Sequence, residues 1–383
     1  MFRRAWQWLR HPLGAPRRTL TVLALLAIIA VGVALTGRQL WARHHYRTAG
    51  RALERYRLVE ARDHLERCAL IWSGDFQVHL LVAQTARRLG DYEAAEQHLA
   101  RCQAIRGGIP EEVVLEQSLI RAQRGGMDSV TPYLRSLVEA HHPATPLILE
   151  SMAQGYMRSY RFGDAAAILH LWRERSPDDL QANFLEGIVR ERVGPEQEAV
   201  DNYRRVLEVD PEHDAARHQL AALLIDRAQP AEAMEHLAVL SQRRPGDLHV
   251  RVRLAQCQLA LGRTAEAEAG LERVLAVNAR FRPALAARGE LALQLDQAAA
   301  AEGWLRQALD QDAADFRTSF LCARSLRQQE KNAEAEAVEQ RLKVMEADIK
   351  RLQKIIKNDI NRAPDDPALR TEIGIILLRA GSN

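Results

Sequence analysis

Alanine recurs through this chain at a fixed interval. Eight alanines head similar helical stretches, and apart from one gap of 70 residues each step between neighbours is 34 residues. They are Ala61, Ala95, Ala165, Ala199, Ala233, Ala267, Ala301 and Ala335. A second series of small residues follows the same steps: Ala49, Ala83, Ala153, Gly187, Ala221, Ala255, Gly289 and Ala323. A fixed period of this length predicts a stack of repeated modules, not one globular core.

The stretch 180–213 shows what one repeat contains. One helical pattern carries an apolar stripe and ends at Gly194-Pro195, and a second pattern carries its own stripe and ends at Asp210-Pro211. Gly187 in the first helix and Ala199 in the second lack bulk, which lets two antiparallel helices approach closely. Each pair must then bury its remaining apolar side against the next pair.

This period and these small-residue positions resemble the tetratricopeptide repeat family. The resemblance extends from residue 42 to about residue 380, with repeats that begin at 42, 76, 110, 146, 180, 214, 248, 282 and 316. The repeat from Pro110 is two residues longer and departs furthest from the pattern. Other residues fill the family's tryptophan position: His45, His79, Val113, Leu149, Asn183, Arg217, Arg251, Leu285 and Ser319. The resemblance implies an all-α, right-handed superhelical solenoid of about nine repeats over 42–347.

Composition fits this expectation. A chain of 383 residues would ordinarily suggest more than one domain, but a solenoid has no such limit because each repeat packs only on its neighbours. The aromatic content of 5% suits helices packed through alanine and leucine. No stretch alternates in the way that predicts strands. We therefore expect one elongated helical domain.

The N-terminus has a different character. Residues 1–18 hold five arginines and no acidic residue, and residues 19–36 hold no charge. As a helix, this uncharged tract is about 27 Å long, just enough to span a bilayer. A cleaved signal peptide is the alternative, but residues 34–38 at the end of the tract match the small-x-small cleavage pattern poorly. The sequence therefore favours a single-pass transmembrane anchor at 19–36.

Arginine counts leave the orientation of this anchor open. Five arginines lie on each side within about 20 residues, so the positive-inside count is a tie. The downstream arginines belong to a folded repeat, and long domains translocate largely regardless of charge. We therefore expect the anchor in the cytoplasmic membrane, a short cytoplasmic N-terminus and the solenoid on the extracytoplasmic side.

Charge and motifs argue against several function classes. The formal net charge is +3, and six arginines with no acid occupy residues 1–40, so the rest of the chain is close to neutral. A nucleic-acid partner is therefore not expected. The sequence also lacks a nucleophile elbow, a phosphate-binding loop and a zinc-protease motif, so we predict that the chain is not an enzyme.

Cysteine and histidine raise the question of disulfides and metals. Cys68 and Cys102 occupy the same position in adjacent repeats, about 10 Å apart, which is beyond disulfide reach. Histidine precedes each by four residues, at His64 and His98, a spacing that could hold two zinc ligands. A structural zinc site needs four ligands, so we expect buried thiols, no metal and no cofactor.

The first helices of stacked repeats line an inner, concave wall, where the resemblance implies a protein or peptide partner. Candidate residues on this wall are Gln84, Arg87, Arg88, Arg121, Gln154, Met157, Arg158, Phe184, Glu191 and Arg192. The alternative is a solvated face that carries scattered charge.

The C-terminal region departs from the repeat. Residues 331–361 predict one extended helix with a heptad seam of Val338, Leu342, Met345, Ile349, Leu352 and Ile356. This seam either pairs with another copy or a partner, or folds back on the last helices. Residues 367–383 repeat the first-helix pattern and predict the first helix of an incomplete tenth repeat.

Together these features predict a membrane-anchored scaffold, similar to bacterial members of the family, that binds peptide or protein partners in its groove during envelope assembly. One alternative is a structural homo-oligomer held by the C-terminal heptad helix. Another is an accessory subunit of a membrane enzyme complex, which differs only in its partner.

Overall fold

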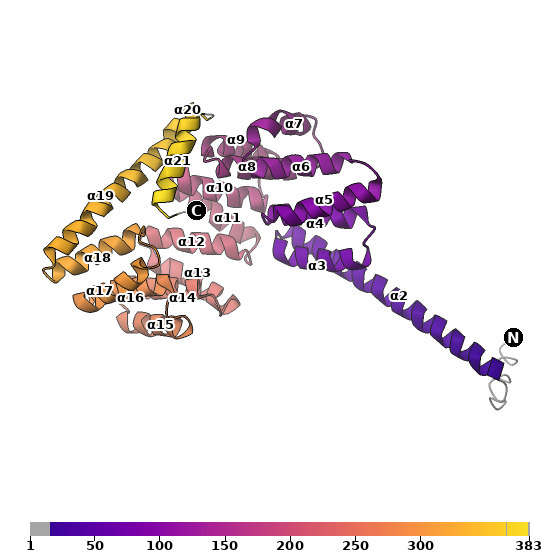
Figure 1. Cartoon of the computed structure of the whole chain (residues 1–383), viewed down its shortest axis with the longest axis horizontal. Coiled ribbons are helices and arrows are strands. Elements are labelled where there is room, and N and C mark those ends of the chain that lie inside the picture. Colours follow the sequence, from indigo (N-terminus) through magenta and orange to yellow (C-terminus); the bar gives the residue numbers. More distant parts are fainter. Residues whose placement is uncertain (1–15, 365, 382–383) are drawn as a thin grey trace. The chain divides into compact units, whose positions relative to one another are not determined.

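A computed structural model describes residues 16–364 and 366–381. The basic segment predicted at 1–18 thus lies mostly outside the described residues. Within the described ranges all regular structure is helical, and successive helices pack as pairs joined by short turns (Figure 1). The expected all-α fold of helix-turn-helix repeats is confirmed.

The chain divides into two compact units, an N-terminal unit up to Ile120 and a C-terminal unit from Arg121 onward. The boundary falls inside the repeat that begins at Pro110, whose pattern is the most degenerate. The division therefore occurs where the repeat signal is weakest.

Among the described residues, five helices lie wholly or partly in the N-terminal unit. Their bounds are α2 (Pro16–Glu54), α3 (Leu58–Ile71), α4 (Phe76–Arg88), α5 (Tyr92–Arg106) and α6 (Glu111–Gln123), which runs across the boundary. The sequence separated the apolar tract at 19–36 from a first repeat beginning at 42. In the structure both belong to α2, which is unbroken because a lone Gly37 costs a helix only about 1 kcal/mol.

The C-terminal unit continues the helix pairs. The helices are α7 (Met127–Glu139), α8 (Thr145–Arg158), α9 (Phe162–Arg175), α10 (Leu180–Val193), α11 (Glu196–Val209), α12 (Asp214–Asp226), α13 (Pro230–Arg243), α14 (Leu248–Ala260), α15 (Thr264–Val277), α16 (Arg282–Gln294), α17 (Ala298–Leu309), α18 (Phe316–Gln328), α19 (Asn332–Lys354), the π-helical turn η1 (Ile355–Asp359), α20 (Ile360–Arg362) and α21 (Pro367–Arg379).

The small-residue series marks the core. All eight alanines that head the second helices are fully buried, including Ala199 and Ala233. A Cβ atom on Gly187 would lie 2.5 Å from the Tyr203 ring, so only glycine fits there. The close helix approach expected from these positions is therefore present.

Aspartates begin several first helices. Asp179 Oδ1 accepts hydrogen bonds from the backbone N–H groups of Gln181 and Ala182, each at 2.9 Å. Asp247 and Asp315 cap α14 and α18 in the same way. These caps satisfy backbone donors that a helix leaves unpaired at its start.

The heptad seam is covered mainly from within the C-terminal unit. Val338 and Leu342 are buried in one cluster with residues of α17 and α18. Further along, Leu352 packs with Ile373 and Ile376 of α21. Ile349, between these clusters, is 42% exposed.

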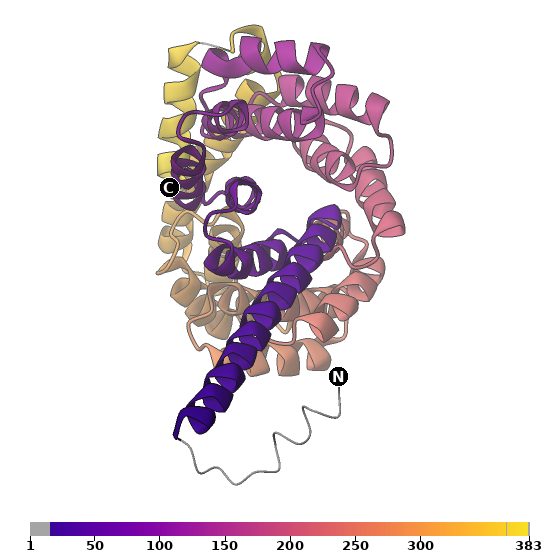
Figure 2. The same cartoon turned by 90° about the vertical axis from the view of Figure 1, so that its right-hand side faces the viewer.

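The end of the C-terminal unit meets its beginning (Figure 2). Ile360 belongs to a cluster that includes Tyr160, in the turn between α8 and α9. Arg370 forms an ion pair with Asp128 at 3.6 Å. The helices after α18 therefore fold back on the first helices of the same unit.

Candidate functional site

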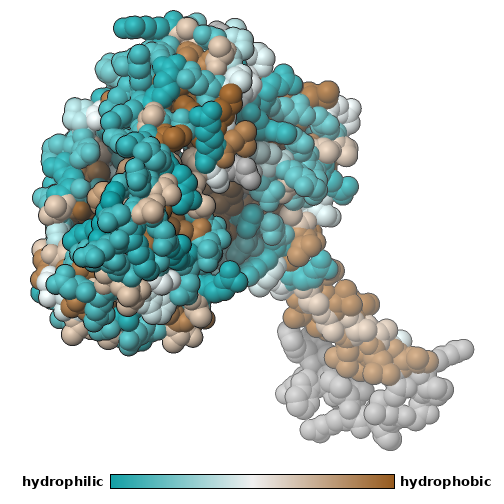
Figure 3. Space-filling model, turned by 60° about the vertical axis from the view of Figure 1, so that its left-hand side comes forward, coloured by the Kyte–Doolittle hydropathy of each residue, from teal (hydrophilic) through white to brown (hydrophobic). Residues whose placement is uncertain are grey.

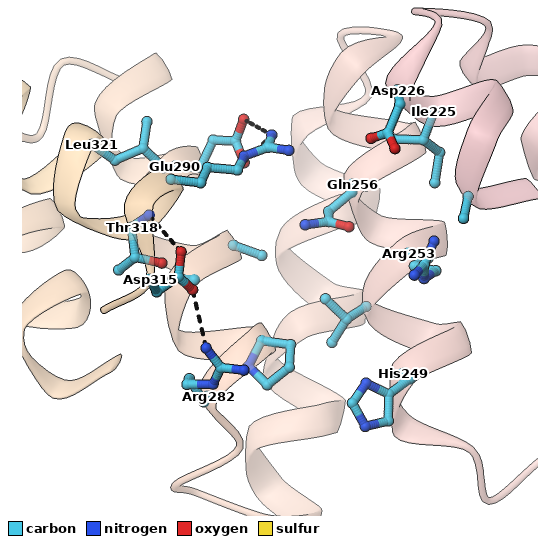
Figure 4. Close-up of a pocket in the computed structure, with 16 residues that line it drawn as sticks. Ile225, Asp226, His249, Arg253, Gln256, Arg282, Glu290, Asp315, Thr318 and Leu321 are labelled. Carbon is cyan, nitrogen blue, oxygen red and sulfur yellow. Dashed lines mark hydrogen bonds and ion pairs between the residues drawn. The ribbon is translucent and has the colours of Figure 1, made fainter. Parts of the chain in front are cut away.

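The first helices of the C-terminal unit carry matching positions that face a common hollow. Ala222 of α12, Gln256 of α14 and Glu290 of α16 are spaced by 34 residues and line one pocket of about 380 Å³ (Figure 4). Ala286 and Ala287 also line this pocket, and their small side chains leave it open. We call this surface the inner groove.

One wall of the inner groove carries charges that neutralise each other. Arg317 donates to Glu290 at 2.9 Å, and Arg282 donates to Asp315 at 3.1 Å (Figure 4). Arg282 also donates to Asp312 at 2.7 Å. Asp315 is already the N-cap of α18. These groups are held by partners within the fold.

The opposite wall differs. Asp226, Arg253 and Gln256 make no side-chain hydrogen bond or ion pair with any residue that the structure describes, and all three line the pocket (Figure 4). His249 lies on the same wall, with its ring 4.9 Å from the Phe281 ring. This wall therefore presents a carboxylate, a guanidinium and an amide toward the groove.

Two neighbouring hollows extend the groove. One of about 410 Å³ shares His249 and Arg253 and reaches Phe184 of α10 and His218 of α12. Another of about 360 Å³ shares Asp226 and Gln256. The inner groove thus runs along the first helices from α10 to α18.

The electrostatics around Arg253 favour a negative group. Burial lowers the pKa of His218, and the charge of Arg253 lowers it further. Arg244, which lines the same hollow, is held by Asp214 at 2.9 Å. Of the arginines that line these three hollows, Arg253 is therefore the one without an ion-pair partner among the described residues.

The residues predicted for the groove fall into both units. Gln84, Arg87 and Arg88 lie in the N-terminal unit, and the other seven lie in the C-terminal unit. Phe184 alone among the ten lines one of these three hollows.

Several of the predicted residues are engaged within the fold. The Arg88 guanidinium lies 4.1 Å from the centre of the Tyr56 ring. Gln154 hydrogen-bonds to Gln123, and Glu191 accepts a hydrogen bond from the Tyr203 hydroxyl at 2.9 Å. Arg121, Met157, Arg158 and Arg192 are exposed or half-buried.

Arg87 requires a correction, because it does not face an open groove. It is 1% exposed, and its Nε donates to Glu116 at 2.7 Å. Both side chains are buried in the N-terminal unit. The groove pattern places Arg87 correctly on the first helix, but a carboxylate from the next first helix covers it.

The sequence contained the signal for the groove residues that were missed. Two steps of 34 from Phe184 lead to His218 and Val252, and one step from Arg192 leads to Asp226. His218, Val252 and Asp226 line the hollows described above. The same repeat positions, followed further along the chain, locate the groove.

The histidines form pairs between the two helices of a repeat. His79 Nε2 donates to the Ser73 carbonyl at 3.1 Å, which leaves its Nδ1 to accept from His98 Nδ1 at 2.9 Å. His45 and His64 form the equivalent pair at 2.5 Å. Burial, then the neighbouring histidine, lowers the pKa of His98. In each pair the histidine on the first helix, His45 or His79, occupies the family's tryptophan position.

The cysteines are structural. All four are buried and unpaired with one another. Cys68 Sγ donates to the Ala42 carbonyl, and Cys102 Sγ makes the equivalent contact with Phe76. Among the described residues, no group of three or more histidine, cysteine or acidic side chains is arranged to hold a metal ion.

A stack of helix pairs with an inner groove defines a helical repeat protein of the binding-scaffold class. Family models described as tetratricopeptide repeat match residues 76–107, 196–247 and 226–291. The last two ranges include α12, α14 and most of α16, which line the groove. The matched ranges are tetratricopeptide repeats, and proteins built from such repeats are generally non-catalytic scaffolds.

Solved structures with similar folds include a tetratricopeptide repeat protein from Parabacteroides merdae, with 15% identity, coverage of 75% of this chain and 99% of that chain, and a TM-score of 0.39. PilW, a type IV pilus biogenesis factor, has 19% identity, coverage of 59% and 97%, and a TM-score of 0.44. YrrB, described as having an unusual peptide-binding site, has 18% identity, coverage of 48% and 94%, and a TM-score of 0.40. No curated protein matches the chain in sequence.

Proposed function

We propose that this chain is a membrane-anchored scaffold that binds an extended segment of a partner protein in its inner groove. The observation that carries the proposal is the wall formed by Asp226, Arg253 and Gln256. Charged and amide groups that have no partner within the described fold retain their capacity to bind one from outside. The opposite wall, whose charges are paired with each other, bounds the groove on its other side.

The chemistry of the groove suits a peptide. The Gln256 amide can donate to and accept from a peptide backbone. Asp226 and Arg253 add opposite charges, which select a segment of complementary charge order. The small residues Ala222 and Ala286 leave space for its side chains.

The N-terminal helix supplies the anchor in this proposal. Among the described residues, one helix is long and apolar enough to cross a membrane, beginning at Leu20 in α2, and a signal sequence satisfies the same criteria. Its apolar side chains are exposed (Figure 3). We propose an uncleaved anchor at 19–36 in the cytoplasmic membrane, with the repeats on the extracytoplasmic side and a role in envelope assembly.

The homo-oligomer alternative depends on the heptad seam. Most of the seam packs inside the C-terminal unit, so the apolar surface left for a second copy is small around Ile349. This burial favours the groove as the binding site. An accessory role in a membrane enzyme complex would use the same groove with a different partner.

Photo-crosslinking in cells tests the groove. A photoreactive residue replaces Gln256 in one chain and Ala276, which is exposed on the second helix α15, in another. We expect a defined partner to be captured from position 256 and not from position 276. Ala286→Arg should block that capture by filling the groove, whereas Ala276→Arg should not. Equal capture from both positions would contradict the proposal.

A reporter that is active only outside the cytoplasm, fused after Asn383, tests the orientation. We expect activity from intact, membrane-bound protein. An inactive reporter on that same protein would reverse the proposed sidedness.

A further inference from the structure

The contacts between α2 and α3 fix which part of α3 lies nearest the apolar tract. Cys68 Sγ contacts the Ala42 carbonyl at 3.3 Å, and Trp72 Nε1 donates to Gln39 Oε1 at 2.6 Å. As α3 proceeds, its partners on α2 therefore approach the tract. The C-terminal end of α3 lies level with Gln39.

Helix geometry then sets the depth of this end. Gln39 lies three residues beyond Thr36, the last residue of the tract, or about 5 Å along an unbroken helix. The headgroup region on each side of a bilayer is about 5 to 8 Å thick. If residues 19–36 span the bilayer, the end of α3 lies at the level of the headgroups.

The side chains at this level have the composition of a membrane interface. Leu40 and Trp41 on α2 and Leu70 on α3 are exposed, and Trp72 is half-buried. Trp72 also packs near the Tyr46 ring, with the centroids 6.0 Å apart. Tryptophan is enriched at membrane interfaces because its ring is apolar and its N–H is polar.

Basic side chains surround these apolar ones. Arg38 and Arg43 on α2 and Arg67 on α3 are exposed, whereas Glu66 and Asp75 are the nearby acids. Long arginine side chains lay their stems along apolar surface while the guanidinium meets phosphate. We define the juxtamembrane face as Arg38, Leu40, Trp41, Arg43, Arg67, Leu70 and Trp72.

We infer that the juxtamembrane face is a lipid-binding surface that holds the N-terminal unit in the headgroup region. This inference rests on the proposed anchor at 19–36. It goes further, because an anchor alone would allow the first repeat to stand clear of the membrane. Docking through α3 fixes the direction in which the first repeat leaves the bilayer.

Spin-label accessibility in the full chain tests this inference. The protein is placed in nanodiscs of phosphatidylcholine and phosphatidylglycerol, with single labels at Ile28→Cys, Leu70→Cys or Val59→Cys. Val59 is the matched control for Leu70, since both are exposed aliphatic residues on α3. Val59 is 57% exposed and Leu70 is 79% exposed, and they lie roughly 16 Å apart along the helix. All four native cysteines are buried, and burial raises the pKa of Cys68, Cys102 and Cys257 to about 11 and also raises that of Cys322. The unmodified chain should therefore take up no label.

We expect a water-soluble nickel relaxation agent to reach the label at 70 several-fold less readily than the label at 59. The label at 28 should be the most strongly protected. Equal nickel accessibility at 70 and 59, with 28 protected, would overturn the lipid-binding surface and leave the anchor standing. An unprotected label at 28 would overturn the anchor and this inference together.

Discussion

α4 and α12 are both first helices of a repeat, but the residues in their last turns have different roles. In α4 of the N-terminal unit, Arg87 is buried against Glu116 and Arg88 lies over the Tyr56 ring. The equivalent positions in α12 hold Ile225 and Asp226, and Asp226 has no side-chain partner among the described residues while it lines the groove. The end of α4 is held by contacts within the fold, and the end of α12 is available to a ligand.

This difference separates a repeat position from its use. The period places a residue on the inner wall, but the residue's neighbours decide whether it is exposed. In the N-terminal unit Arg87 and Arg88 are held by contacts within the fold, whereas in the C-terminal unit Asp226 and Arg253 have no side-chain partner that the structure describes. Substitutions at equivalent positions should therefore have very different effects on stability.

The largest expected effect is on the buried ion pair. Glu116→Ala leaves the Arg87 guanidinium buried without its carboxylate, which should cost about 3 to 5 kcal/mol of unfolding free energy. Asp226→Ala in the groove should cost less than about 0.5 kcal/mol. Chemical denaturation of both variants measures the contrast.

A double variant controls for simple loss of packing. Arg87→Met with Glu116→Leu removes both charges and keeps similar volume, so it should recover much of the lost stability. If Glu116→Ala were as mild as Asp226→Ala, the distinction between the two helix ends would fail.

A smaller effect is expected from overpacking the repeat core. Ala199→Leu or Ala233→Leu inserts methyl groups into a fully buried position and should cost about 1 to 3 kcal/mol. Ala222→Leu, at the half-buried groove position, should change stability little while it obstructs the groove. Melting temperatures equal to wild type for Ala199→Leu and Ala233→Leu would contradict the role assigned to these alanines.

These cases also show what the sequence could predict. Burial of Ala199 and Ala233 was predictable because a close helix contact tolerates few residue types, so the alanine recurs in every repeat except the one from Pro110. Burial of Arg87 was not, because its partner Glu116 comes from the repeat with the most degenerate pattern. The sequence predicts an apolar tract at 19–36 and a first repeat from 42 but does not say that one helix carries both, because a change from apolar to charged residues neither ends nor extends a helix.

A further test compares carboxylates on the two faces of the C-terminal unit. Glu302 on α17 accepts hydrogen bonds from Lys331, Arg306 and Gln329, which lower its pKa from 4.5 to about 2. A carboxyl whose pKa falls on folding adds stability above its unfolded pKa, and that stability is lost as the pH falls from about 4.5 to about 2.

Glu302→Gln should therefore lower stability by about 1 to 3 kcal/mol at neutral pH and show little difference from wild type near pH 2. Asp226→Asn, which removes the charge of the unpaired carboxylate in the groove, is the matched control. Denaturation curves at several pH values measure both, and a constant difference across the range would contradict the ion-pair account.

The smallest expected effect concerns the seam. Ile349→Asp changes a position that is partly exposed, so unfolding free energy should change by no more than about 0.5 kcal/mol. Leu342→Asp places a charge in the cluster beside α18 and should destabilise the unit clearly. Light scattering should give the same mass for wild type and Ile349→Asp. A wild-type dimer that Ile349→Asp converts to a folded monomer would instead support the homo-oligomer.

The most direct test of the central claim combines charge reversal with the crosslink from position 256. Arg253→Glu reverses the charge of the unpaired arginine in the groove. Arg88→Glu reverses the charge of an arginine on a first helix of the N-terminal unit. Because a hydrogen bond to a charged group contributes about 1.5 to 3 kcal/mol, Arg253→Glu should reduce partner capture about tenfold or more, and Arg88→Glu should leave it unchanged. If Arg88→Glu abolished capture and Arg253→Glu left capture unchanged, the assignment of partner binding to the C-terminal unit would be contradicted.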